Sequence, residues 1–170
     1  MTRRFGDRAR FAVEVGEVWP PPPALATGDL RTVDLWAGGA WLTTFDNTAY
    51  VPSFTHYMRS DAEQVRRRDI RPCPFPGHSP EEVCRLLYAE MGETDFSWQF
   101  RLMDWGPTTD DATCIAYLDA GDELVLTLVR REDNPSPEDP AKVVVAKILA
   151  DEFVAVLTEA SDLLDAERVQ

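Results

Sequence analysis

Apolar and polar residues alternate in several segments of the chain, a period of two that is typical of strands with one buried face. Two such segments lie before residue 46, residues 8–18 and residues 28–36, and residues 40–45 are expected to return as a third. Four consecutive prolines at residues 20–23 follow the first segment and predict a stiff, extended connector. Gly38 and Gly39 supply the positive φ angles of a tight hairpin, so the second and third segments are expected to pair.

The second half of the chain contains further strand patterns and one proline-rich loop. The expected strands are residues 97–104, residues 113–118, residues 123–130 and residues 142–149, and the loop is residues 134–140. Within residues 123–130, leucines at even positions alternate with Val125 and Val129, so both faces are apolar. We therefore expect a central strand that is covered on both sides.

Three segments follow the helical period of 3.6 residues instead. They are residues 53–68, residues 80–91 and a last helix that begins at Asp151. Ser79 and Pro80 are typical of the N-cap and first turn of the second helix, and Leu86 is expected to face inward. Strands in antiparallel groups, separated and followed by helices, predict an α+β fold: about six or seven mostly antiparallel strands and three helices, the last C-terminal. A chain of 170 residues fits a single domain, residues 1–170.

Charge excludes one class of function. The chain has 17 basic and 30 acidic residues, a net charge of -13, and 21 of the acids lie in residues 72–170. A protein that binds the phosphate backbone needs a cationic face, so nucleic acid is not expected as a direct partner. No apolar stretch reaches the roughly 18 residues of a membrane span, and no signal peptide is recognisable. An odd number of cysteines fits a reducing compartment, so we expect a cytoplasmic protein without a membrane partner.

Residues suited to catalysis or metal binding are sparse. His56 is expected to be a partly exposed residue of the first helix, and His78 lies in a proline-rich loop. Cys73 and Cys84 lack the Cys-x-x-Cys partners of a zinc site, and Cys84 is expected to pack as a small hydrophobe. Neither a glycine-rich phosphate loop nor a nucleophile turn is found, so we expect no catalytic residue, no cofactor and no metal.

Acidic residues cluster at the predicted turns of the second half. The set is Asp110, Asp111, Asp119, Asp122, Glu123, Glu132 and Asp133. One interpretation is that they are solvated turn residues. The other is that these turns lie at the ends of neighbouring strands, so that their charges add into one negative field that steers and holds a cationic protein.

Tryptophans supply a second kind of candidate. Trp36, Trp41, Trp98 and Trp105 fall at or near predicted strand ends, where one or two could stay exposed. Tryptophan is a favoured anchor of protein interfaces, and packing in the core is the alternative for each.

Four short motifs lie in the first 55 residues: Phe5-Gly6-Asp7, Phe11-Ala12-Val13-Glu14, Leu35-Trp36-Ala37-Gly38-Gly39 and Tyr50-Val51-Pro52-Ser53-Phe54. Together they resemble the immunity protein 42 family of bacterial polymorphic toxin systems. The resemblance implies a small cytoplasmic protein that binds and neutralises a cognate toxin. The acidic set would suit the basic active site of such a toxin, for example a nuclease. The resemblance supplies no catalytic residues.

These observations lead to the hypothesis of a non-catalytic immunity protein that binds its toxin through the acidic set. One alternative is a small carboxylate-based hydrolase that uses Asp110 and Asp119 with His78. Another is a regulatory or scaffold domain without a toxin partner. The gene beside this one distinguishes them, because an immunity protein is expected next to a toxin.

Overall fold

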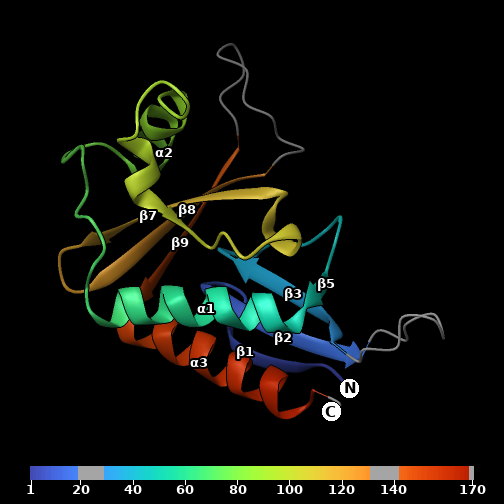
Figure 1. Ribbon diagram of the computed structural model, residues 1–170. Helices are drawn as coiled ribbons and strands as arrows, with labels where there is room; N and C mark the ends of the chain where they lie inside the picture. The colour runs from blue at the N-terminus through green and yellow to red at the C-terminus, as the bar shows by residue number, and fades with distance from the viewer. Residues whose placement is uncertain (19–28, 131–141, 169–170) are drawn as a thin grey trace.

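The computed structural model describes residues 1–18, 29–130 and 142–168 and has an α+β architecture (Figure 1). Sheet A contains β1 (Arg3–Asp7), β2 (Phe11–Val18), β3 (Leu30–Ala37), β4 (Ala40–Trp41) and β5 (Thr48–Tyr50). Sheet B contains β6 (Arg101–Leu102), β7 (Ala112–Asp119), β8 (Glu123–Arg130) and β9 (Val143–Leu149). The helices are α1 (Val51–Arg66), α2 (Pro80–Ala89) and α3 (Ala150–Ala166), with short 3-10 helices η1 (Ser97–Phe100) and η2 (Pro107–Thr109). The predicted α+β class with a C-terminal last helix is confirmed.

Strand pairing is antiparallel throughout both sheets. Sheet A has the order β1-β2-β3-β4, with β5 also paired to β3, and sheet B has the order β6-β7-β8-β9. Gly38 and Gly39 form the predicted hairpin, with φ angles of 54° and 81°. Nine strands in the described residues exceed the six or seven predicted, because charged β1 and three-residue β5 show too little alternation to be recognised. The polyproline run at residues 20–23 and the loop at residues 134–140 lie outside the described residues.

Helices α1 and α3 lie side by side and cover one face of sheet A, the inner face (Figure 1). On β3, buried and half-buried residues alternate along the whole strand, as expected for a sheet with one covered face. Phe11 of β2 contacts Phe153 of α3, with ring centroids 4.9 Å apart. The same apolar cluster continues onto one face of sheet B, so the two sheets share a core.

Sheet B is covered on both faces. Its even-numbered leucines, such as Leu126 of β8, belong to the shared core, whereas Val125 and Val129 pack with α2 in a second apolar cluster. The prediction that residues 123–130 form a strand covered on both sides is confirmed.

The start of α2 is as the sequence predicts, but the position of one of its side chains is not. The Ser79 hydroxyl accepts a hydrogen bond from the Glu82 N–H and the Glu82 carboxylate accepts one from the Ser79 N–H, which confirms the predicted cap. Leu86 was expected to face inward, but it is exposed, because the buried side of this short helix runs through Val83 and Leu87.

None of the helices in the described residues combines the length and apolar character needed to cross a membrane.

The predicted strand over residues 97–104 is wrong. Residues 97–100 form η1, and only Arg101–Leu102 are extended, as β6. Ser97 and Phe100 are both buried. A 3-10 turn places residues three apart on the same side, whereas a strand would point them to opposite faces.

The third predicted strand, residues 40–45, is shortened to β4. After Trp41 the chain turns, and the Leu42 N–H donates to the Leu35 carbonyl at 2.8 Å. The Leu35 N–H in turn donates to the Thr43 hydroxyl oxygen at 3.2 Å. A side chain therefore satisfies the β3 backbone where a longer strand was expected, and the same hydroxyl donates to Asp34 Oδ1.

Asp61 fastens α1 to the segment after β6. Its carboxylate accepts hydrogen bonds from the Met103 N–H at 2.8 Å and from the Trp105 indole N–H at 2.7 Å. Burial raises the pKa of Asp61 above its ordinary value, and the two hydrogen bonds only partly oppose this effect. Trp105 is itself buried and packs edge-on against Phe54 at 5.5 Å.

Candidate functional site

The seven acidic residues predicted to bind a partner do not lie together. Asp110 and Asp111 precede β7, whereas the members within residues 119–123 lie at its other end, in the turn to β8. An eight-residue strand separates the two groups by roughly 25 Å. Glu132 and Asp133 lie outside the described residues. The described members therefore do not form one continuous surface, and their role in binding stays a prediction.

The group at the β7–β8 turn is engaged within the chain. Asp122 forms an ion pair with Arg68, just beyond α1, and Glu123 lies 3.5 Å from the ammonium of Lys147 on β9. Arg68 also contacts Asp151 in the first turn of α3, at 2.8 Å. These ion pairs join the turn to the ends of two helices. Carboxylates already bound in this way are less available to a partner.

The residues suggested for a hydrolase are not assembled. His78 and Asp119 line an open groove together with Cys73, but Asp110 lies at the far end of β7. The paired carboxylates of glycosidases, for comparison, lie within about 10 Å of each other. His56 is exposed on α1, as expected. In the part of the chain that the structure describes, no three His, Cys, Asp or Glu side chains are grouped to hold a metal ion.

Two of the cysteines are buried on opposite faces of sheet B. Cys84 of α2 packs in the second apolar cluster, and Cys114 of β7 packs in the shared core, as small hydrophobes. Burial raises the pKa of both thiols.

The tryptophans divide between core and surface. Trp105 is buried, and Trp98 is half exposed beside the guanidinium of Arg101. Trp41 is 37% exposed at the edge of sheet A and stacks on Trp36, with ring centroids 6.0 Å apart and planes inclined by 15°. Among the described residues, this is where two tryptophan rings meet at the surface.

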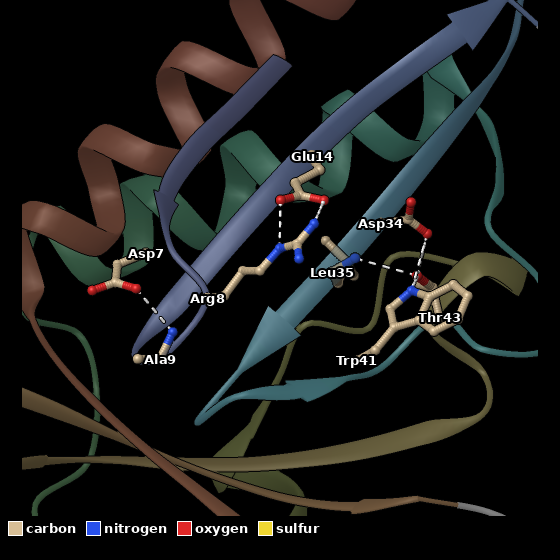
Figure 2. Close-up of polar contacts among 8 residues, drawn as sticks. All are labelled: Asp7, Arg8, Ala9, Glu14, Asp34, Leu35, Trp41 and Thr43. Atoms are coloured by element: carbon tan, nitrogen blue, oxygen red, sulfur yellow. Dashed lines mark hydrogen bonds and ion pairs between the residues drawn. The ribbon is translucent and has the colours of Figure 1, made fainter. Parts of the chain in front are cut away.

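The candidate site lies on the face of sheet A opposite α1 and α3, which we call the open face. It comprises Arg8, Glu14, Asp34, Trp36 and Trp41. Figure 2 shows Arg8, Glu14, Asp34 and Trp41 on the side of β2 and β3 that points away from the helices. Arg8 comes from the β1–β2 turn, Glu14 from β2, Asp34 and Trp36 from alternate positions of β3, and Trp41 from β4.

Arg8 and Glu14 form the first half of the open face. The Arg8 Nε and Nη2 donate to the two carboxylate oxygens of Glu14, each at 2.7 Å. This bidentate contact holds the pKa of the nearly buried Glu14 below its ordinary value, although burial opposes the shift. The Arg8 guanidinium also lies over the Trp36 ring, 4.2 Å from its centroid.

Asp34 and Trp41 form the second half. Asp34 Oδ1 accepts hydrogen bonds from the Trp41 indole at 3.0 Å and the Thr43 hydroxyl at 3.3 Å (Figure 2). It also accepts one from the Asn47 amide at 3.0 Å. The Trp41 N–H also reaches the Thr43 hydroxyl oxygen at 3.1 Å. Three donors on one oxygen fix both the carboxylate and the indole ring.

Glu14 and Asp34 face each other directly across β2 and β3. Two like charges in such a pair are destabilising unless other groups compensate them. Arg8 compensates Glu14 and, from beyond ion-pair distance, also attracts Asp34, whose direct hydrogen-bond donors are neutral. The sequence pattern singled out Trp36 and Trp41 but neither acid, since single acids on an alternating strand resemble ordinary solvent-facing residues. Their opposition becomes visible only once the register is known.

Comparisons with known proteins identify no relative: no protein-family model, no curated protein and no solved structure matches the chain. The resemblance of the N-terminal motifs to an immunity family therefore stays a prediction. The chemistry of the open face is the basis on which a function can be inferred.

Proposed function

We propose that this protein is a non-catalytic inhibitor of the immunity type that binds a cationic bacterial toxin, one to one, through the open face. The observation that carries the proposal is the row Arg8, Trp36, Trp41 on a sheet face opposite both packed helices. Arginine and tryptophan are enriched among the residues that dominate binding energy at protein interfaces.

The side chains of this row are already ordered. Arg8 is held by Glu14, and Trp41 is held by Asp34 and Thr43. Binding therefore loses little additional side-chain entropy, which is a main cost of association. Preorganised anchors of this kind support tight binding from a small number of residues.

The charge of the chain supports a cationic partner. A net charge of -13 creates a field that accelerates encounter with a basic surface and is screened by salt beyond about 8 Å. In this proposal Asp110 and Asp111 contribute to steering, as do the acids of the β7–β8 turn. The open face makes the contact that holds the complex.

The test begins with the toxin-bearing protein encoded beside this gene. Purified together, the two should form a 1:1 complex, and co-expression should restore growth of cells that carry the toxin. Trp41→Ala should weaken binding by about 2 kcal/mol, or roughly 30-fold, in a calorimetric titration.

Trp98→Ala is the matched control, because Trp98 is also exposed but lies on η1 beside sheet B. It should leave affinity within about twofold of the unaltered protein. Circular dichroism of both variants checks that each is folded. Failure to form a complex with the adjacent toxin contradicts the proposal, and equal losses for Trp41→Ala and Trp98→Ala remove the open face from it.

A further inference from the structure

Asp34 presents one carboxylate oxygen to solvent. All three hydrogen bonds to this side chain end on Oδ1. No described residue bonds to Oδ2, and Oδ2 is not among the buried polar atoms left without a partner, so solvent reaches it. No basic side chain within residues 1–18, 29–130 and 142–168 forms an ion pair with Asp34. Its orientation is fixed, and its second oxygen is free to accept.

The Trp41 ring stacks on Trp36 and is 37% exposed, and we call the ring face away from Trp36 its outer face. Within the strand order, β4 is the last strand on this side, and Trp36 and Trp41 are direct partners across β3 and β4. The indole N–H is tied to Asp34, so the ring plane is set beside the carboxylate. The outer ring face therefore provides a negative π surface next to a negative oxygen.

In the first half of the open face, a carboxylate and an indole ring together bind a guanidinium. There, the guanidinium of Arg8 lies over the Trp36 ring and bonds to the carboxylate of Glu14. Asp34 and Trp41 repeat the combination of carboxylate and indole on the neighbouring strands. In this second pair, no basic side chain of the described residues takes the position that Arg8 takes in the first.

We infer that Asp34 Oδ2 and the outer ring face of Trp41 bind a basic side chain, an arginine or lysine, of the partner protein. The inference rests on the proposed function, and it names the chemistry of the partner's anchor residue. A guanidinium satisfies both features at once, because its N–H groups bond to the oxygen while its plane stacks on the indole. Both acceptors carry negative potential, so they select a cation over a neutral group of the same shape.

The test uses the unaltered protein alone, with blocked arginine (N-acetyl-argininamide) as the probe and the indole N–H signals followed by NMR. At constant ionic strength, the Trp41 signal should shift saturably as the probe is raised to about 100 mM, a range suited to a single cation–π and carboxylate contact. Blocked citrulline has the same shape without charge and should produce no saturable shift. The Trp98 signal should not follow that of Trp41.

Two charge-matched variants locate the site. Asp34→Asn keeps an acceptor for the Trp41 and Asn47 donors and should lower affinity for the probe at least about fivefold. Asp95→Asn makes the same change of net charge at an exposed residue just before η1, outside the open face, and should have no effect. A shift that survives Asp34→Asn, equal shifts with citrulline, or no shift of Trp41 overturns the inference.

A sugar is the other ligand that stacks on tryptophan beside a carboxylate. A saturable shift of Trp41 with neutral oligosaccharides, and none with arginine, assigns the site to carbohydrate and overturns the inference. If the arginine titration gives no shift but the protein still forms a complex with the toxin, the inference fails and the proposed function stands. A saturable shift of Trp41 with arginine, but no complex with the toxin, supports the cation site and contradicts the proposed function.

Discussion

Sheet A and sheet B differ in the face that points away from the shared core. In sheet B, almost every position of β8 is apolar. One face of this sheet belongs to the shared core, and α2 covers the other face. In sheet A, β3 alternates: its apolar residues pack toward α1 and α3, and Asp34 and Trp36 are half-buried on the open face. The β2 residue of that face in the candidate site, Glu14, is itself nearly buried. A covered second face contributes stability, whereas an open face that nevertheless holds fixed tryptophans and opposed carboxylates is suited to binding. The contrast locates the candidate site without any appeal to the acidic half of the chain.

The largest expected effect is on stability, and it tests whether the packing of α2 on sheet B is needed for folding. Leu87→Ala removes a fully buried side chain between α2 and sheet B and should lower the free energy of unfolding by about 3 kcal/mol. Urea unfolding monitored by circular dichroism measures it. Leu86→Ala, at the adjacent and exposed position, should change stability by less than about 0.5 kcal/mol. Similar losses for the two variants would mean that α2 does not pack on the sheet as described.

A second prediction contrasts two carboxylates through the pH dependence of stability: Asp61, whose donors are neutral, and Glu14 of the open face, which is paired with Arg8. The folded-state pKa of Asp61 is raised above its value of 3.8, so its contribution is greatest below that pH and is lost as pH rises through the folded pKa. The folded-state pKa of Glu14 is lowered below 4.5, so its contribution is present above that pH and is lost as pH falls through the folded pKa.

The two carboxylates should therefore give slopes of opposite sign. Relative to Asp61→Asn, the unaltered protein should lose stability as pH rises from about 3 to about 7, and relative to Glu14→Gln it should gain. Urea titrations across this range measure both differences. Slopes of the same sign would contradict the burial of Asp61 or the pairing of Glu14 with Arg8.

The smallest effect concerns thiol reactivity and leaves the protein unaltered. Cys84 and Cys114 report on opposite faces of sheet B, and both thiols are buried with raised pKa values, so neither should react with a thiol reagent while the protein is folded. Cys73, which is only half-buried, should react first. Mass spectrometry after brief labelling identifies the modified residue. Rapid labelling of Cys84 would show that the α2 face opens readily.

Much of the fold could be predicted from local pattern. The period of two identified β2, β3, β7, β8 and β9, the period of 3.6 identified the three helices, and Gly38, Gly39 and Ser79 marked a hairpin and a helix start. The errors share a cause. In residues 97–100 and 42–45 the chain satisfies its backbone with a 3-10 turn or with the Thr43 side chain, and neither choice has a periodic signature.

The candidate site divides in the same way. Composition and local pattern determined that Trp36 and Trp41 lie near strand ends, that the chain is acidic, and that β3 has a polar face, because these depend on residues close in sequence. Only the tertiary structure decided that Glu14 opposes Asp34, that Arg8 reaches both Glu14 and Trp36, and that the acids of the second half are divided between the two ends of β7. Strand register and the packing of helices on one face arise from contacts between distant parts of the chain, and local periodicity carries no information about either.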